Sequence, residues 1–215
     1  MREDRPRRTA RRSSSGDECH RDLMKKRVMG AAAIIIIIAA ALLATVSVRA
    51  GWYLTLRGGE NGETCVRYRL DEGDWFCVGF IHSVHKNPLI DCYQIQEHKI
   101  YVEQTYYYSF GAGVQSQLNE GESMTLGEDG SIVVSNIHKD FETIPLQYIV
   151  GSRSDHTLIL GDIREDYDQV RDLVGVFPED GMEEVTLESG IRVISLSALF
   201  GRSSVVSIGY EYRLF

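Results

Sequence analysis

Residues 28–48 form an uncharged apolar segment that is long enough to cross a lipid bilayer. These 21 residues, VMGAAAIIIIIAAALLATVSV, contain no charged side chain and no histidine. As a helix they extend about 31 Å at about 1.5 Å per residue, which matches the hydrocarbon core of a bilayer. Five consecutive isoleucines, Ile34 to Ile38, promote aggregation in water, whereas a helix in lipid satisfies all its backbone groups internally. The segment therefore predicts a single transmembrane helix that contacts membrane lipid.

The charges on the two sides of this segment predict its orientation. Residues 1–27 carry eight Arg and two Lys against five acidic residues, a net charge of +5. Residues 51–215 carry 12 basic and 26 acidic residues, a net charge of −14. Short basic flanks stay in the cytoplasm. We therefore expect a single-pass protein of the cell membrane with residues 1–27 inside the cell and residues 51–215 outside it.

A cleavable signal peptide is the alternative interpretation of the apolar segment. Val48-Arg49-Ala50 offers small residues at the spacing of a cleavage site. The apolar part of a signal peptide usually spans about 7–15 residues, and this one is longer, so we favour an uncleaved anchor at residues 28–50. Residues 1–27 are polar and rich in Arg and Ser, which predicts a disordered cytoplasmic tail because they cannot bury enough apolar surface to fold.

Residues 51–215 show the pattern of a single all-β domain. Apolar and polar side chains alternate in segments such as 52–56, 66–70 and 206–214, and further short β-rich runs lie at 131–135, 145–150 and 156–160. Short strands at intervals of about 8–12 residues predict an antiparallel sandwich or a barrel-like fold. The exported part is therefore expected to be an all-β domain.

One segment of this domain has helical instead of alternating spacing. Between Asp162 and Gly175 the apolar residues fall at intervals of three or four. Asp162 followed three residues later by Glu165 resembles a capping box, and Gly175 is suited to the end of a helix. We predict one short helix inserted into the β fold.

Three cysteines lie in the exported part, where disulfides persist. Cys65 and Cys77 flank a segment that indicates a hairpin, and a turn centred on Asp71 places the two cysteines opposite each other, within the reach of a disulfide. We predict a Cys65–Cys77 bond with Cys92 free. Since a shift of one residue in register removes this opposition, three buried thiols remain the alternative.

Polar and glycine residues interrupt the β pattern at two places. The first is FIHSVHKNP at residues 80–88, followed by Asp91, and the second is YYYSFGAG at residues 106–113. Interruptions of this kind on a rigid scaffold commonly line a site. We predict that the two segments meet at one sheet edge and form a ligand- or partner-binding site from His82, Ser83, His85, Asp91, Ser109, Gly111 and Gly113.

These two segments resemble the family called "domain of unknown function 1850". Its members share a strand that ends in HS[VI], an acidic residue several positions later and an [SF]GAG element. The resemblance covers about residues 52–160 and resumes at 191–196, so residues 162–184 resemble an insertion, and Asp91 stands where the family usually has Glu. The resemblance implies an exported, membrane-tethered protein that assists a TRAP-type transporter permease in the uptake of a small-molecule solute.

Catalytic interpretations of the same residues are the alternatives. His82 and His85 point to opposite faces of a regular strand, so a metal site completed by Asp91 or His98 requires a bend between the two histidines. A triad of Ser83, His82 and Asp91 lacks the sharp turn that exposes a nucleophile. We therefore predict binding without catalysis, cofactor or metal, and keep an exported hydrolase or metal-dependent enzyme, and a structural cell-envelope module, as alternatives. The charge of −14 argues against nucleic acid as a partner.

Overall fold

The protein is described by a computed structural model that covers residues 24–32, 34–41, 50–59, 62–111, 113–141, 146–176 and 182–214. The chain divides into two units, residues 1–50 with 214–215 and Gly51–Arg213. In the first unit residues 24–32 and 34–41 are helical, and the side chains of Ile34 to Ile38 are 54–67% exposed. Among the described residues, no helix is both long enough and apolar enough to span a bilayer. The predicted tail up to residue 23, and positions 33 and 42–49 of the predicted anchor, lie outside the described residues.

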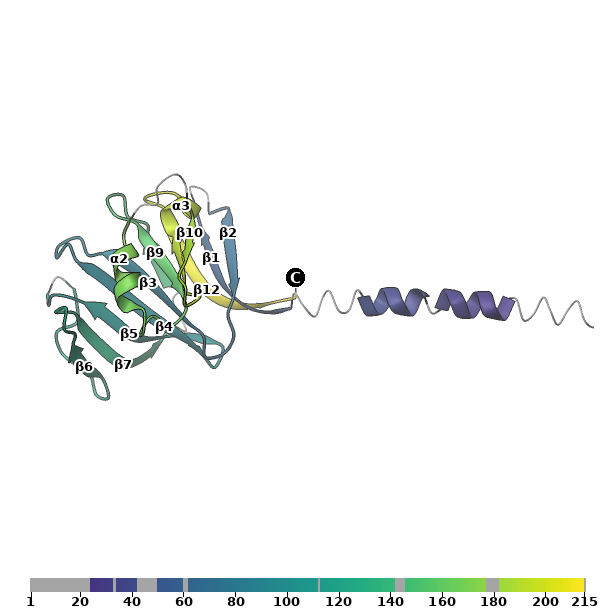
Figure 1. Ribbon diagram of the computed structural model, residues 1–215, viewed down its shortest axis with the longest axis horizontal. Coiled ribbons are helices and arrows are strands. Elements are labelled where there is room, and N and C mark those ends of the chain that lie inside the picture. Colours follow the sequence, from purple (N-terminus) through teal and green to yellow (C-terminus); the bar gives the residue numbers. More distant parts are fainter. Residues whose placement is uncertain are drawn as a thin grey trace, which may run out of the picture. The chain divides into compact units, whose positions relative to one another are not determined.

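The second unit consists mostly of antiparallel strands arranged in two sheets, which confirms the predicted all-β class (Figure 1). The smaller sheet has the strand order β2-β1-β12-β8 and pairs the first strand of the unit with its last. Val206 and Ile208 of the last strand are fully buried, as the alternating pattern predicts. The strands of the smaller sheet are β1 (Gly51–Gly58), β2 (Thr64–Arg69), β8 (Leu146–Ile149) and β12 (Val205–Arg213).

The larger sheet has the strand order β10-β11-β9-β3-β4-β5-β7-β6. Its centre is a meander in which β3, β4 and β5 follow one another in space as they do along the chain. Its strands are β3 (Trp75–Ile81), β4 (Pro88–Gln96), β5 (Lys99–Tyr107), β6 (Ser123–Leu126), β7 (Ile132–Asp140), β9 (His156–Leu160), β10 (Glu184–Thr186) and β11 (Arg192–Ser195).

The two faces of the larger sheet are buried by different elements. On the face that we call inner, side chains such as Phe76 pack with Leu54 and Ile208 of the smaller sheet in one hydrophobic cluster. On the opposite, outer face, Ile90 packs with Val170 of helix α2 (Tyr167–Leu173) in a second cluster (Figure 1). Burial on both faces explains why β3 is a nearly continuous apolar run instead of an alternating one.

Helix α2 confirms the predicted short helix but begins later than the sequence suggests. Asp166 stands at its N-terminus and makes no capping hydrogen bond with its side chain. Asp162 instead accepts hydrogen bonds from the backbone N–H of Arg164 at 3.1 Å and from its Nε at 2.9 Å. The predicted capping box is therefore wrong, because the acidic side chain is used by the loop before the helix. Gly175 follows the helix with φ of +76°, as expected for a residue that ends a helix.

A second short helix, α3 (Leu196–Phe200), was not predicted. Five residues are too few to display helical periodicity in the sequence. Ser195 caps this helix, since its Oγ accepts a hydrogen bond from the backbone N–H of Ala198 at 3.0 Å. The Ser195 hydroxyl in turn donates to the fully buried carboxylate of Asp155. The only local sign of this helix in the sequence was a single serine, a common N-terminal capping residue, in front of an apolar run.

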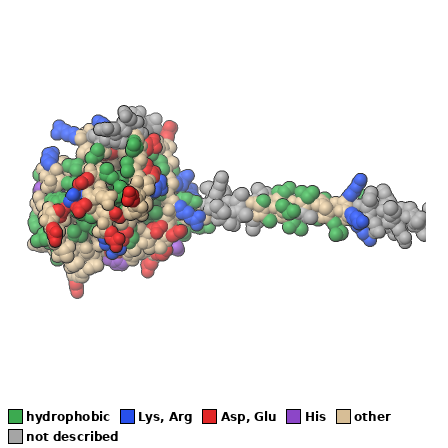
Figure 2. Space-filling model, in the orientation of Figure 1, with side chains coloured by type: hydrophobic (Ala, Val, Ile, Leu, Met, Phe, Trp, Pro, Cys, Tyr) green, Lys and Arg blue, Asp and Glu red, His purple; other side chains and the backbone are tan. Residues whose placement is uncertain are grey.

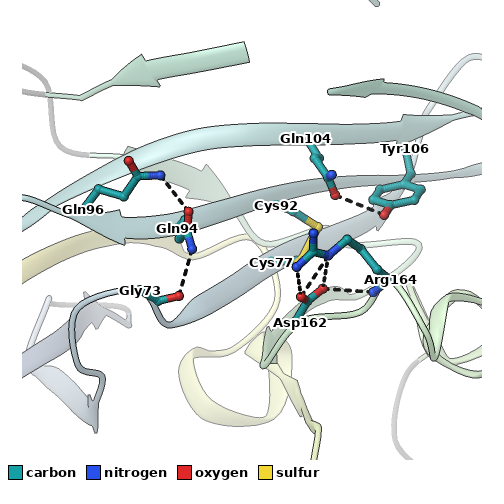
Figure 3. Close-up of polar contacts among 9 residues, drawn as sticks. All are labelled: Gly73, Cys77, Cys92, Gln94, Gln96, Gln104, Tyr106, Asp162 and Arg164. Atoms are coloured by element: carbon teal, nitrogen blue, oxygen red, sulfur yellow. Dashed lines mark hydrogen bonds and ion pairs between the residues drawn. A yellow bond between two sulfur atoms is a disulfide. The ribbon is translucent and has the colours of Figure 1, made fainter. Parts of the chain in front are cut away.

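The predicted disulfide between Cys65 and Cys77 is wrong. Cys65 lies in β2 of the smaller sheet and is exposed with a free thiol, whereas Cys77 in β3 of the larger sheet is bonded to Cys92 in β4. The turn at 71–74 carries the chain from one sheet to the other and closes no hairpin. Cys77 and Cys92 are directly opposed on neighbouring strands, with their Cα atoms 4.1 Å apart. Figure 3 shows the bond between these two strands.

Candidate functional site

Part of the inner face of the larger sheet is left without a second sheet over it. The smaller sheet has four strands and the larger has eight, and β8 is an edge strand of the smaller sheet. On β8, the hydroxyl of Tyr148 is hydrogen-bonded to that of Tyr93 on β4. A separate hydrophobic cluster on β4, β5 and β7 includes Leu89, Tyr107 and Val134. These three residues line a cleft of about 880 Å³, a volume in the range typical of small-molecule sites.

The strand register determines which side chains form the floor of this cleft. Asp91 of β4 lies opposite Thr105 of β5, and Thr105 lies opposite Val134 of β7. Residues that are directly opposed in an antiparallel pair project from the same face. All three line the cleft. The floor therefore combines a carboxyl group, a hydroxyl group and an apolar side chain in one row.

Asp91 is a carboxyl group with one hydrogen bond and no ion pair among the described residues. Its Oδ1 accepts a hydrogen bond from Thr105 Oγ1 at 2.9 Å. The side chain keeps some accessible surface, which faces the cleft, although protein surrounds most of it. Burial raises the pKa of Asp91 to about 6, and the hydrogen bond from Thr105 acts in the opposite direction. The charge of the cleft floor therefore changes close to neutral pH.

His156 contributes an aromatic side chain to a second row of the floor. It lies opposite Phe80 in the register, and the two rings stack with their centroids 4.9 Å apart. Its Nδ1 accepts a hydrogen bond from the backbone N–H of Gly151 at 3.0 Å, so the neutral ring carries its proton on Nε2. Burial lowers the pKa of His156, while the charge of Asp155 acts in the opposite direction. Sequence reasoning missed this residue because a histidine at the start of a short strand carries no distinguishing signal.

The turn after β3 supplies the next group of cleft residues. The backbone N–H of His82 donates to Asn87 O at 2.9 Å, and that of Lys86 donates to His82 O at 2.9 Å. This turn provides the bend that brings His82 and His85 together, with ring centroids 4.8 Å apart. His82, Ser83 and Lys86 line the cleft, and Lys86 Nζ donates to the carbonyl oxygen of Ser83.

The second predicted motif meets the first through His85. His85 Nε2 lies 3.2 Å from the carbonyl oxygen of Gly111. Gly111 accepts a hydrogen bond from the backbone N–H of Val114 at 3.0 Å, which closes a turn. Gly111 and Gly113 have φ of +91° and +92°, a conformation that favours glycine. Gly113 and Val114 line the cleft beside the first motif.

The structure thus brings the seven predicted residues to one region. Four of them line the cleft: His82, Ser83, Asp91 and Gly113. His85 and Ser109 line a smaller hollow that shares His82 with the cleft, and Gly111 contacts His85. The two motifs meet because β3 and β5 run in the same direction on either side of β4, so their ends reach the same edge.

The loop between β8 and β9 forms a wall of the cleft that sequence reasoning did not find. Gly151, Ser152, Arg153 and Ser154 all line it. Arg153 is exposed and has no carboxylate partner within the described part of the chain. A single arginine in a short polar loop looks like an ordinary surface residue, and only the pairing of β9 with β3 places it here.

The histidines and carboxylates described near the cleft do not form a metal-binding cluster. Across the residues that the structure describes, no three His, Cys, Asp or Glu side chains gather in a way that could hold a metal ion. His98, the alternative third ligand, stacks on Trp52 at 4.4 Å. Asp91 is hydrogen-bonded to Thr105, and in the described structure it makes no hydrogen bond to His82. The arrangement is suited to holding a ligand between apolar walls and a few polar groups.

Residues 76–166 match the family described as "Domain of unknown function (DUF1850)". This match supports the family resemblance for the segment that contains all seven predicted site residues. It also includes Thr105, Arg153 and His156, whereas α2 begins at Tyr167, just beyond it. Comparisons with curated proteins and with solved structures found no match.

Proposed function

We propose that residues 51–215 form an exported domain that binds a small organic molecule in the cleft and acts as an accessory to a TRAP-type solute transporter. The cleft carries this proposal. It lies on a rigid sheet, has the volume of a small-molecule site, and contains the charged side chains of Lys86, Asp91 and Arg153, which form no ion pair in the described structure. The family resemblance supplies the association with a transporter.

The arrangement of the side chains favours ligand binding over catalysis. A hydrolase requires a nucleophile hydrogen-bonded to a base that is in turn oriented by a third group. Within the described residues Ser83 is exposed, and the carboxylate of Asp91 is engaged by Thr105. His82 Nδ1 accepts a hydrogen bond from the backbone N–H of His85 at 3.3 Å, so this ring nitrogen is occupied by a contact within the turn. These contacts hold the two imidazoles in place without forming a catalytic chain.

We further propose that residues 28–48 anchor the protein in the cell membrane with the cleft outside the cell. The support is the charge of +5 before the segment and −14 after it. External protease on intact cells should digest residues 51–215 and spare residues 1–27. A mature protein that begins at Gly51 would contradict the anchor and leave export intact.

A solute screen on the full-length protein in detergent tests the binding function. Val114 is half-buried at the wall of the cleft, so Val114→Trp should fill part of it. Val185→Trp is a matched control on β10, outside the cleft, at a position that is 37% exposed. A solute of the cleft should raise the melting temperature of the wild type and of Val185→Trp but not that of Val114→Trp. A library in which no solute shows this difference would favour the structural alternative.

Co-purification tests the proposed partner. A tagged full-length protein should retain a TRAP-type permease from the same membrane. Val114→Trp should weaken retention only if the cleft must be loaded before the permease binds. Recovery of the protein without any permease, under conditions that preserve other membrane complexes, would leave solute binding as its sole proposed role.

A further inference from the structure

The charges of the cleft are separated by depth. Asp91 lies on the floor, in the row with Thr105 and Val134. Lys86 and Arg153 are exposed and lie on loops at the rim. In the described structure neither cation forms an ion pair with Asp91, and Thr105 is the only neighbour that favours its ionised form. The cleft therefore has a negative inner end and a positive outer end.

The floor is suited to an ammonium group. Asp91 uses Oδ1 for its hydrogen bond to Thr105, and its other oxygen has no partner among the described residues. In the described part of the chain only Thr55 Oγ1 and Arg213 Nε are fully buried side-chain polar atoms without a hydrogen-bond partner, so this oxygen of Asp91 is accessible from the cleft. The stacked rings of Phe80 and His156 line the same cleft, and aromatic faces attract cations. A primary ammonium would supply the counter-charge that the protein itself does not.

The rim is suited to a carboxylate. The Arg153 guanidinium can hold a carboxylate with two parallel hydrogen bonds, and Lys86, on the turn after β3, adds a second positive charge to the lining of the same cleft. Beside the row of Asp91 the cleft is apolar: Leu89 lies opposite Phe80 in the second row of the floor, and Tyr107 and Val114 also line the cleft. These residues would bury a hydrocarbon side chain.

We propose that the cleft takes a zwitterionic amino acid with an apolar side chain, its ammonium group on Asp91 and its carboxylate at Arg153 and Lys86. This inference rests on the proposed binding function and names the class of ligand for that site. A simple organic acid would leave Asp91 without a counter-charge on the floor. A simple amine would place its free end beside two cations.

Three ligands of nearly the same shape separate these classes. L-phenylalanine has both charges, 3-phenylpropanoic acid lacks the ammonium group, and phenethylamine lacks the carboxylate. Titration calorimetry on the full-length protein near pH 7 should find that phenylalanine binds about 100-fold more tightly than either analogue, because each analogue leaves one charged group of the cleft without its partner. L-leucine should bind in the same way, since the walls recognise hydrocarbon without a specific shape.

Two substitutions assign the two ends of the ligand. Asp91→Asn should weaken phenylalanine binding about 30-fold or more and should strengthen the weak binding of 3-phenylpropanoic acid, because the variant no longer has a carboxylate without a counter-charge on the floor. Arg153→Gln should weaken the binding of phenylalanine and of 3-phenylpropanoic acid but not that of phenethylamine. Arg67→Gln, on an exposed position of β2, and Asp168→Asn, 79% exposed on α2, are matched controls that should bind like the wild type.

The outcomes distinguish this inference from the proposed function. Equal affinity for phenylalanine and 3-phenylpropanoic acid, or an Asp91→Asn variant that binds phenylalanine normally, overturns the amino-acid ligand. If no amino acid binds but another solute binds the wild type and not Val114→Trp, the ligand class is wrong and the binding function stands. If neither the amino acids nor any library solute binds, both proposals fail.

Discussion

Charged side chains on the outer face of the larger sheet form ion pairs, whereas those in the cleft on its inner face do not in the described structure. On the outer side, Arg171 of α2 lies 2.8 Å from both Asp129 and Asp168, and Asp162 is paired with Arg164. Figure 2 shows acidic and basic side chains next to one another on the face that carries α2. In the cleft, by contrast, Asp91 has a single neutral hydrogen-bond partner in the described structure.

This difference separates charges that stabilise the fold from charges that are available to a ligand. Ion pairing lowers the pKa of Asp162, chiefly through the hydrogen bonds from Arg164, so its ionised form stabilises the native state. Burial raises the pKa of Asp91, so its ionised form destabilises the native state. A group that costs stability and is not paired is typical of a binding site. The predictions below test whether the two regions behave in opposite ways.

The largest expected effect is the loss of the disulfide that lies between β3 and β4. The Cys77–Cys92 bond joins residues 15 apart, and removal of such a bond costs about 3 kcal/mol on the chain-entropy model. Urea unfolding of the double variant Cys77→Ala/Cys92→Ala should show this loss. Cys65→Ala is the control and should not change stability, because Cys65 is exposed and free. Equal stability of the double variant and the wild type would contradict the bond.

Substitution of Asp91 should have an effect of similar size but of the opposite sign. The raised pKa means that the folded protein holds the proton up to about pH 6, while the unfolded chain releases it near pH 4. Stability is therefore lost as the pH rises from about 4 to about 6, by about 3 kcal/mol at most. Asp91→Asn removes this loss and keeps an acceptor for Thr105. Urea unfolding should find the variant less sensitive to pH in this interval and more stable than the wild type near pH 7.

The ligand should reverse this pH dependence. An ammonium group on Asp91 favours the ionised carboxyl, so binding should weaken about tenfold for each pH unit below about 6. The other titratable side chains described as lining the cleft include His82, His156, Lys86 and Tyr107, and Tyr93 and Tyr148 lie near Asp91 with raised pKa values. Asp91→Asn should abolish the pH dependence if Asp91 is its source. A dependence that persists in this variant would instead point to the histidines.

The general fold was predictable because its signals are local. Alternation identifies β1, β2 and β12, a β-rich run identifies β9, and the helical spacing after Asp162 identifies α2. The two site motifs were also predictable, since they stand at the ends of β3 and β5, and a meander places both ends at one edge. Such information is contained within short stretches of the chain.

The rest depended on pairings between distant segments. Cys65 and Cys77 look like partners in a hairpin, and only the change of sheet after β2 separates them. Arg153 and His156 reach the cleft because β9 pairs with β3, far earlier in the chain. The chemistry of Asp91 likewise comes from its position opposite Thr105 and from the part of the inner face that lacks a second sheet. No local pattern encodes these relationships.

A smaller effect is expected for Arg171, the arginine that joins α2 to the turn before β7. Its side chain is only 23% exposed and contacts three carboxylates, those of Asp129, Asp168 and Asp172. Arg171→Gln should lower the free energy of unfolding by about 1–2 kcal/mol, more than an isolated surface pair, since it breaks a network. Arg153→Gln is the matched change in the cleft and should alter stability by less than about 0.5 kcal/mol. Equal losses in the two variants would remove the distinction between paired and available charges.

The smallest expected effect is that of Asp162→Asn, which is the counterpart of Asp91→Asn on the outer face. Hydrogen bonds from Arg164 lower the pKa of Asp162, so its stabilising contribution is present above about pH 4 and is lost as the pH falls through the lower native value. The Asp162 side chain is 37% exposed, so solvent screening limits this contribution to about 0.5–1 kcal/mol. Urea unfolding should therefore show a small loss of stability near pH 7 that shrinks in acid, whereas Asp91→Asn shows a gain near pH 7. If Asp91→Asn also loses stability near pH 7, burial does not dominate the energetics of Asp91, and the protein itself stabilises the ionised carboxyl of the cleft.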